Sequence, residues 1–206
     1  MTRIKICGMR GVEDALAAVE AGADALGVIL AASPRRVGLE EVAEIRRAVP
    51  PFIPLVGVFV DPKGDEVRAA LAAGVDVLQF SGGESPAFCR GFARPHIKVF
   101  HVGEHAPDRS RIAAYQGAMP MFDTAGGQLP GGTGTPFAWS LLEPLRDCGP
   151  FVVAGGLQAE SVGEPIAMLR PFAVDVSSGV ERDGRKSPEL MRAFVRAVRE
   201  SDATAR

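Results

Sequence analysis

The sequence has little of what marks several specialised protein classes. Its three cysteines form no CxxC pair, so neither a disulfide framework nor a zinc site is expected. The net charge of −2 argues against a large nucleic-acid surface, which would carry an excess of basic residues. No apolar run approaches the roughly 20 residues of a membrane helix, and no secretory signal is visible at the start. We therefore expect a cytoplasmic globular protein without membrane or nucleic-acid partners.

The 206 residues suffice for a single domain over residues 1–206 with a substantial core. Strand-like and helix-like runs alternate along the whole chain. Strands are expected over residues 3–7, 25–30, 53–60, 75–80, 96–100, 118–122, 151–154 and 172–176. Helices are expected over residues 12–21, 39–48, 66–73, 86–92, 108–115, 137–148, 159–169 and 188–200.

Eight such units in one short chain favour a closed (β/α)₈ barrel over an open sheet. An open dinucleotide-binding sheet usually carries G-x-G-x-x-G after its first strand, whereas this chain has Cys7-Gly8-Met9-Arg10-Gly11 there. An internal repeat supports regular βα units: residues 20–26 and 72–78 both place a glycine at a helix end and an aspartate before a strand. The active site of a barrel lies on the loops after its strands.

Three consecutive strand ends are rich in glycine or serine. Residues 126–135 contain five glycines directly after Phe122-Asp123-Thr124, and Ala154-Gly155-Gly156-Leu157 and Ser177-Ser178-Gly179-Val180 follow the next two strands. Glycine lets backbone N–H groups approach an anion closely, so the three loops together predict a shared phosphate pocket. One such loop alone is equally compatible with an irregular surface loop.

Polar residues at strand ends give the candidate chemistry. Cys7 and Asp123 would face each other across the barrel mouth, an arrangement that suits proton abstraction on one side of a substrate and donation on the other. The alternative for Cys7 is a small packed residue. Arg35 and Arg36 compete to bind an anionic group, and at least one of them is expected to be a solvated loop residue. Further strand-end candidates are Asp61, Gln79, Ser81 and Asp175, while His96, His101 and His105 lack ligand spacing and are expected in structural or surface positions.

Seven motifs, in order along nearly the whole chain, resemble the phosphoribosylanthranilate isomerases of tryptophan biosynthesis. They are Lys5-Ile6-Cys7-Gly8, Ser33-Pro34-Arg35-x-Val37, residues 56–60, Phe122-Asp123-Thr124, Gly131-Gly132-Thr133-Gly134-x-x-Phe137-x-Trp139, residues 154–157 and residues 174–181. The glycine motifs are weak singly. The first motif combined with Asp-Thr before Gly-Gly-Thr-Gly is specific.

The resemblance implies a (β/α)₈ barrel of the ribulose-phosphate-binding type. The implied activity is the cofactor-free, metal-free Amadori rearrangement of N-(5′-phosphoribosyl)anthranilate, a small phosphorylated substrate, by a monomer or homodimer. It implies Cys7 as general base, Asp123 as general acid and Arg35, rather than Arg36, as the residue that binds the anthranilate carboxylate. The implied phosphate ligands are Gly132, Gly134, Gly155, Gly156, Ser178 and Gly179, with Gln79, Ser81 and Asp175 as further pocket residues. The mechanism calls for a high pKa at Asp123 and a low pKa at Cys7.

One departure from the family pattern stands after the fourth strand, where Gln79-Phe80-Ser81-Gly82 replaces Gln-Leu-His-Gly. Ser81 thus removes an imidazole expected to shape the substrate end of the pocket.

A related barrel isomerase of histidine biosynthesis, or a bifunctional one, is a rival interpretation, but its paired aspartates contrast with Cys7. Indole-glycerol-phosphate synthase would need Lys and Glu at strand ends, whereas Lys5 is expected to point to the barrel core. A non-catalytic phosphosugar-binding barrel is the remaining alternative.

Overall fold

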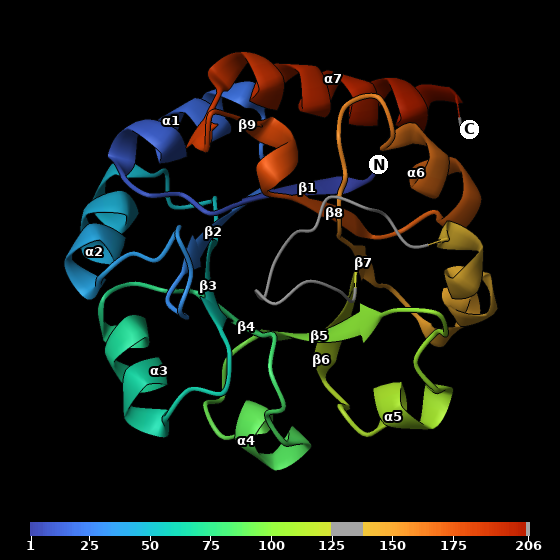
Figure 1. Ribbon diagram of the computed structural model, residues 1–206. Helices are drawn as coiled ribbons and strands as arrows, with labels where there is room; N and C mark the ends of the chain where they lie inside the picture. Colours follow the sequence, from blue (N-terminus) through green and yellow to red (C-terminus); the bar gives the residue numbers. More distant parts are fainter. Residues whose placement is uncertain (125–137, 205–206) are drawn as a thin grey trace.

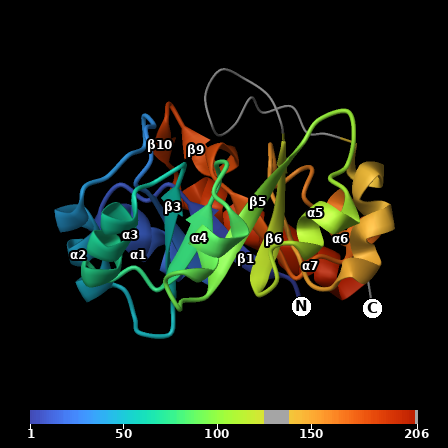
Figure 2. The ribbon, with the colours of Figure 1, turned by 90° about the horizontal axis from the view of Figure 1, so that it is seen from below.

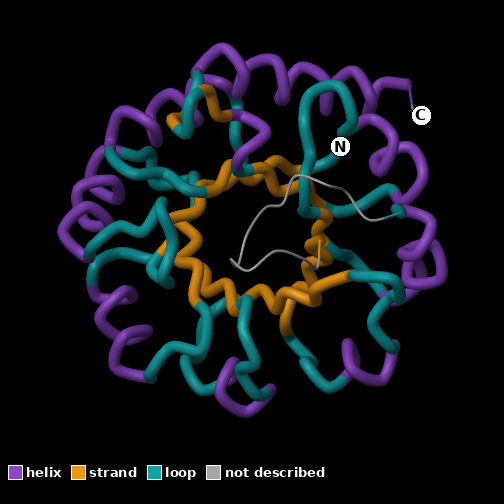
Figure 3. Tube along the Cα trace, viewed as in Figure 1, coloured by secondary structure: helices purple, strands orange, loops and turns teal. Residues whose placement is uncertain are grey.

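The protein is a closed barrel of eight parallel strands in the order β1 to β8, which confirms the fold expected from the sequence. The computed structural model describes residues 1–124 and 138–204. Figures 1 and 3 view the barrel along its axis, with the strands as an inner ring and the helices outside them. The strands are β1 Arg3–Cys7, β2 Ala25–Ile29, β3 Leu55–Phe59, β4 Val77–Phe80, β5 His96–Val102, β6 Ala118–Thr124, β7 Val152–Val153 and β8 Ala173–Val176.

The outer ring consists of helices that follow the strands in turn. They are α1 Val12–Ala21, α2 Leu39–Ala48, α3 Gly64–Ala72, α4 Pro86–Arg90, α5 Arg109–Ala113, the 3₁₀ helix η1 Trp139–Cys148, α6 Gly163–Leu169 and α7 Pro188–Thr204. Helix α7 packs against α1 and α6 and so completes the ring (Figure 1). Within the described residues, none of the helices combines the length and the apolar composition needed to cross a lipid bilayer.

Successive side chains of each strand point to opposite sides of the sheet, so each strand contributes to two cores. On β1, Ile4 and Ile6 belong to the large apolar cluster between the strands and the helices. Lys5 and Cys7 have the opposite orientation and face the barrel interior, where the inward side chains of the other strands form a second, smaller cluster that includes Val99 and Met121. Because both faces are buried, the strands appear in the sequence as nearly continuous apolar runs.

The repeat of glycine and aspartate has a structural cause. Gly22 and Gly74 both have positive φ angles, of 102° and 109°, at the ends of α1 and α3. In each unit the following aspartate accepts a hydrogen bond from a strand N–H: Ile4 N lies 2.9 Å from Asp24 Oδ2, and Leu55 N lies 2.8 Å from Asp76 Oδ2. Each aspartate therefore satisfies a backbone donor near the start of a neighbouring strand.

Two helices differ from expectation because of proline. The segment after β6 was expected as an α-helix over residues 137–148, but it is a 3₁₀ helix from Trp139 with Pro144 inside it. A proline in an α-helix interior has no N–H to donate and clashes with the preceding turn. The helix expected over residues 159–169 begins only at Gly163, which places Pro165 in the first turn, where proline is tolerated.

A two-stranded hairpin after β8 was not expected. It follows the 3₁₀ turn η2 Ser178–Val180 and consists of β9 Glu181–Arg182 and β10 Arg185–Lys186. Its loop is Asp183-Gly184, with φ angles of 52° and 72°. Asp-Gly at a two-residue loop with both φ angles positive is a preferred hairpin turn, because its twist matches that of the flanking strands.

A buried ion pair fixes the loops after β3 and β4. Lys98 Nζ lies 2.6 Å from Glu84 Oε2, and both side chains are 2% exposed. Glu84 Oε1 accepts hydrogen bonds from the backbone N–H groups of Asp61 and Gly82, at 2.9 and 3.1 Å. Lys98 also donates to Gly82 O at 2.6 Å. This network holds the loop that begins at Ser81 against β5.

Candidate functional site

A cavity lies where the barrel strands end, and most of the candidate residues line it. They are Cys7, Arg35, Gln79, Ser81, Asp123, Gly155, Gly156, Asp175, Ser178 and Gly179. The side view in Figure 2 places the β9–β10 hairpin at this end of the molecule and the N-terminus near the other. Gly132 and Gly134 lie outside the described residues.

Cys7 is the last residue of β1 and is 6% exposed. Gly27 of β2 stands beside it, and a Cβ there would come within 2.6 Å of Cys7 Sγ, so glycine provides the space for the sulfur. Lys5 precedes Cys7 by two residues and points to the same side of β1. Its Nζ lies 2.8 Å from Asp175 Oδ1, and the two side chains are only 5% and 9% exposed. Lys5 therefore points into the barrel core, as expected, but its amine reaches the groups around Cys7.

Asp123 is near the end of β6, with its carboxylate toward the cavity. The backbone N–H of Thr124 donates to Asp123 Oδ1 at 2.8 Å. Gly155 has a φ angle of 96°, and a Cβ at this position would approach Asp123 Oδ1 to 2.9 Å and Thr124 Oγ1 to 2.1 Å. Glycine at 155 is thus required both by its backbone conformation and by the carboxylate packed against it.

The loops after β7 and β8 touch directly. A Cβ on Gly179 would lie 1.9 Å from Leu157 O, so only glycine allows this approach. Gly155 and Gly156 in the first loop, and Ser178 and Gly179 in the second, line the same part of the cavity. The prediction that these two strand ends share one pocket is therefore consistent with their positions.

Arg35, and not Arg36, lines the cavity. Its guanidinium forms a two-pronged pair with Glu181, with Nε 2.7 Å from Oε1 and Nη2 2.8 Å from Oε2. Arg36 is exposed and borders a separate hollow between α2 and α3. Only Arg35 of the two arginines therefore lines this cavity, and its role in binding an anionic group stays a prediction.

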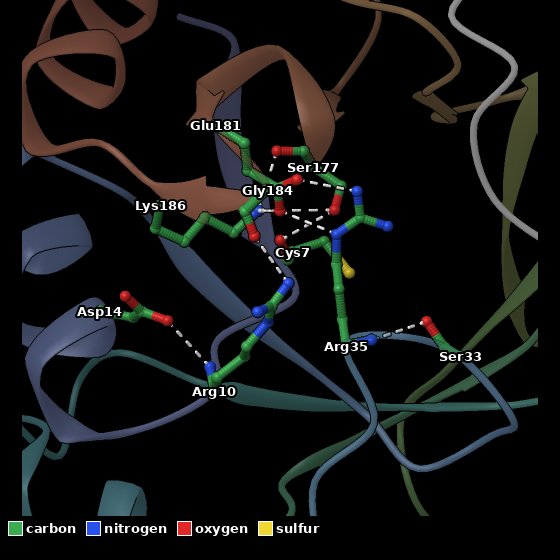
Figure 4. Close-up of polar contacts among 9 residues, drawn as sticks. All are labelled: Cys7, Arg10, Asp14, Ser33, Arg35, Ser177, Glu181, Gly184 and Lys186. Atoms are coloured by element: carbon green, nitrogen blue, oxygen red, sulfur yellow. Dashed lines mark hydrogen bonds and ion pairs between the residues drawn. The ribbon is translucent and has the colours of Figure 1, made fainter.

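The β9–β10 hairpin contributes a second cation. Lys186 Nζ lies 2.9 Å from Glu181 Oε1 and 2.8 Å from Ser177 O, and its side chain is 2% exposed. Ser177 Oγ in turn donates to Cys7 O at 3.1 Å. Figure 4 shows Arg35 and Lys186 converging on Glu181 beside Cys7. The Glu181 carboxylate therefore joins the hairpin to the loop after β2, and Ser177 links Lys186 to the end of β1.

The opposite wall of the cavity contains Gln79, Ser81 and His101. Gln79 Nε2 donates to Ser81 Oγ at 3.3 Å, while its buried Oε1 has no partner among the described residues. His101 Nε2 lies 3.0 Å from Ser81 O, and His101 is paired in register with Asp123. His101 was expected at the surface beyond the strand. It is exposed, but it lines the cavity because β5 continues to Val102 and keeps its alternation.

Burial and charge set the acidities of the two proposed proton carriers. Burial raises the pKa of the Asp123 carboxyl, and the nearby Asp175 carboxylate raises it further, against the influence of His101. This direction agrees with the requirement for a general acid. Burial also raises the pKa of the Cys7 thiol, although Lys5 and Lys186 oppose it. The low pKa expected at Cys7 is therefore wrong for this structure, because desolvation outweighs the cations.

Sequence reasoning missed Glu181, Lys186 and the position of His101. The Asp183-Gly184 turn was the available signal for the hairpin that carries Lys186 inward. For metals, the described part of the chain contains no group of three or more His, Cys, Asp or Glu side chains able to hold an ion.

Comparison with known proteins relates the chain to one family. A family model described as N-(5'phosphoribosyl)anthranilate (PRA) isomerase matches residues 4–197. The N-(5'-phosphoribosyl)anthranilate isomerase of Acidithiobacillus ferrooxidans is 47% identical over 203 residues, which cover 97% of this chain and 98% of that protein.

Solved structures give the same relation. The phosphoribosyl anthranilate isomerase of Thermotoga maritima matches with a TM-score of 0.89 and 36% identity, over 97% of this chain and 100% of that one. A phosphoribosyl anthranilate isomerase in complex with reduced 1-(o-carboxyphenylamino)-1-deoxyribulose 5-phosphate matches with a TM-score of 0.83 and 35% identity, over 97% and 100% of the two chains.

The pairing of Glu181 generates a prediction about acid stability. Burial opposes the charge of Glu181, but hydrogen bonds from Arg35 and Lys186 outweigh it and lower the pKa to about 2 from an ordinary value of 4.5. The folded state then binds fewer protons than the unfolded state between these values, so the stabilisation is complete above about pH 5 and is lost as the pH falls toward 2. Urea unfolding of Glu181→Gln between pH 2.5 and 7 (roughly the window of that titration) should show a smaller decline on acidification than the wild type.

The matched control is Glu189→Gln, since Glu189 pairs with Arg182 at the surface and is 71% exposed. Its pH dependence should stay close to that of the wild type. Identical acid profiles for Glu181→Gln and the wild type would contradict the prediction.

Proposed function

We propose, since the chain belongs to the N-(5'-phosphoribosyl)anthranilate isomerase family, that Cys7 and Asp123 perform the proton transfers of its reaction. The protein is an isomerase of tryptophan biosynthesis that converts N-(5'-phosphoribosyl)anthranilate to 1-(2-carboxyphenylamino)-1-deoxyribulose 5-phosphate. The observation that carries the proposal is the placement of Cys7 and Asp123 on β1 and β6, lining one cavity. A monomeric or homodimeric assembly in the cytoplasm stays a prediction.

The rearrangement needs one acid and one base. A proton given to the ribose ring oxygen breaks the bond between that oxygen and C1′, and the nitrogen lone pair of anthranilate forms a C=N double bond there. Removal of the C2′ proton then gives an enol-amine, which becomes the ketone when a proton is added at C1′ and the C2′ hydroxyl loses its proton. All steps are proton transfers within one substrate, so the residues of the chain suffice and no cofactor is required.

Asp123 suits the role of acid. Its raised pKa favours the protonated carboxyl that must donate to the ring oxygen. Since Thr124 N–H already bonds to Oδ1, the carboxyl orientation is restrained before substrate binds. Such restraint reduces the rearrangement needed at the moment of proton transfer.

Cys7 suits the role of base once it is ionised. Lys5 and Lys186 favour the thiolate against the effect of burial. Cys7 and Asp123 lie on the non-adjacent strands β1 and β6, which supports the proposal that base and acid act on different sides of the substrate. Neither residue can therefore replace the other.

Two anionic groups of the substrate would fix its orientation. Arg35 is proposed to bind the anthranilate carboxylate through its guanidinium, because it is the arginine that lines the cavity. Gly155, Gly156, Ser178 and Gly179 are proposed to bind the phosphate through backbone N–H groups, supported by their close packing at the ends of β7 and β8. Gly132 and Gly134 complete this proposal from sequence alone, with Gln79, Ser81 and Asp175 as further lining residues.

The acid–base assignment is tested by two shape-conserving substitutions. Cys7→Ser replaces the thiol by a much weaker acid, and Asp123→Asn removes the transferable proton. Each should lower kcat by roughly 10²- to 10⁴-fold or more, with a small change in KM, since the anion contacts remain. The wild-type pH profile of kcat should be bell-shaped, and each variant should lose one limb.

The matched controls are Cys148→Ser and Asp147→Asn, adjacent exposed positions on η1. Both should retain wild-type kinetics. Near-full turnover by Cys7→Ser would return Cys7 to a packing role and direct attention to another base, first Asp175, which lines the cavity, whereas Asp61 borders the separate hollow beside Arg36.

The carboxylate site is tested by replacing each arginine. Arg35→Ala should raise KM by the equivalent of about 1.5–3 kcal/mol, the usual value of a charge-assisted hydrogen bond. Arg36→Ala should have a smaller effect, because Arg36 borders a different hollow. Equal losses from both substitutions would refute the assignment to Arg35.

The phosphate site is tested by crystallography with inorganic phosphate. The anion should lie against the backbone N–H groups of Gly155, Gly156, Ser178 and Gly179. An anion bound elsewhere, with these loops empty, would show that the phosphate assignment is wrong.

A further inference from the structure

Lys186 is buried at the active site, and the reaction described above gives it neither a proton transfer nor a contact with the substrate. Its side chain is 2% exposed, and Nζ is held by Glu181 Oε1 at 2.9 Å and by Ser177 O at 2.8 Å. Burial of an ammonium group is costly unless it is paired and hydrogen-bonded. These contacts explain how the buried charge is tolerated, but not why the hairpin carries it to the barrel mouth.

The ammonium of Lys186 lies against the end of β1. It is 3.5 Å from Ser177 Oγ, and that hydroxyl donates to Cys7 O at 3.1 Å. A Cβ on Gly8 would lie 3.5 Å from Lys186 Nζ, so the amine packs beside the residue that follows Cys7. Figure 4 shows Ser177 in contact with both the Lys186 amine and Cys7.

The charges around Cys7 leave one cation unbalanced. The groups that face this part of the cavity are Lys5 on β1, Arg35 after β2, His101 on β5, Asp123 on β6, Asp175 on β8, Glu181 on β9 and Lys186 on β10. With Asp123 protonated, as the proposed reaction requires of the acid, the three cations Lys5, Arg35 and Lys186 face the two carboxylates Asp175 and Glu181. A thiolate at Cys7 would balance the remaining charge, and a neutral thiol would not.

We propose that Lys186 is a positioning residue for the base of the reaction, and that its ammonium stabilises the thiolate form of Cys7. This inference rests on the proposed role of Cys7. Lys186 is connected to Cys7 through Ser177 and is buried, and in such a region a charge has a larger effect than in water. Ser177 and Glu181 hold the ammonium at a fixed place, so no rearrangement is needed when the thiol ionises.

Glu181 interacts with both Lys186 and Arg35 in this arrangement. Burial lowers the pKa of Lys186, and the hydrogen bond and charge of Glu181 counteract that effect. The same carboxylate also holds the Arg35 guanidinium. The hairpin thereby links the ionisation of the base to the position of the residue proposed to bind the carboxylate.

The test measures the ionisation of Cys7 in the free enzyme, independently of turnover. Iodoacetamide alkylates the thiolate, so the alkylation rate of the Cys7 peptide, followed by mass spectrometry against pH, gives the midpoint of ionisation. Lys186→Met should move this midpoint upward by about one pH unit and slow alkylation below the midpoint about tenfold. The limb of the kcat profile that reports the base should shift in the same direction.

The matched control is Arg185→Met, which removes one positive charge from the exposed neighbouring position of β10. Its midpoint should equal that of the wild type. Lys186→Arg keeps the charge and should recover most of the shift. If Lys186→Met does not fold, as judged by circular dichroism, Lys186→Gln makes the same comparison with a side chain that can still donate to Ser177 O.

A midpoint unchanged by loss of the Lys186 charge, or shifted equally by Arg185→Met, would overturn the inference. A merely structural role would lower kcat without moving either the alkylation midpoint or the pH limb, and would overturn it as well. Failure of the proposed function is a separate result, because Cys7→Ser would then keep its turnover whatever the alkylation experiment shows.

Discussion

The pairing of β1 with β8 is the constraint on which the site depends. It closes the barrel by aligning Lys5 with Asp175 and Ile6 with Val176, residues that are 170 positions apart in the chain. Lys5 and Asp175 meet inside the barrel as an ion pair, and Cys7 and Ser177 follow at the next inward positions. A shift of one residue in this register would turn Cys7 toward the helices and an isoleucine toward the cavity. The strand pairing that closes the barrel therefore also positions Cys7, the proposed base, at the cavity.

Buried charges at the mouth are tolerated because each one has a partner. Lys5 is paired with Asp175, and Arg35 and Lys186 share Glu181. Removing one member of a buried pair usually costs more than the pair contributes, since the remaining charge is left without compensation. Two cations against the single carboxylate of Glu181 leave one positive charge, which the thiolate proposed for Cys7 would neutralise. Charge complementarity and structural integrity thus depend on the same few side chains.

The architecture was predictable because its signals are local and periodic. Buried strands give apolar runs, and the Gly22 and Gly74 helix ends repeat with their aspartates, so eight units could be counted from the sequence. The helix after β6 was mispredicted because a single proline changes its type. The hairpin was missed because two-residue strands are too short for periodicity, although its Asp-Gly turn was visible. The pKa of Cys7 depends on burial and on Lys186, and neither can be obtained from a motif.

The wall formed by Ser81 shows why a motif cannot be interpreted one position at a time. The family pattern has a histidine at this strand end, and Ser81 suggested a cavity without an imidazole. The structure places an imidazole there from the neighbouring strand, because β5 extends two residues beyond its expected end and His101 bonds to Ser81 O. The pairing of β5 with β6 also aligns His101 with Asp123. Residues that are register partners on adjacent strands point to the same face of the sheet, so the chemistry at this end of the barrel is determined by register as much as by the residue at any one position.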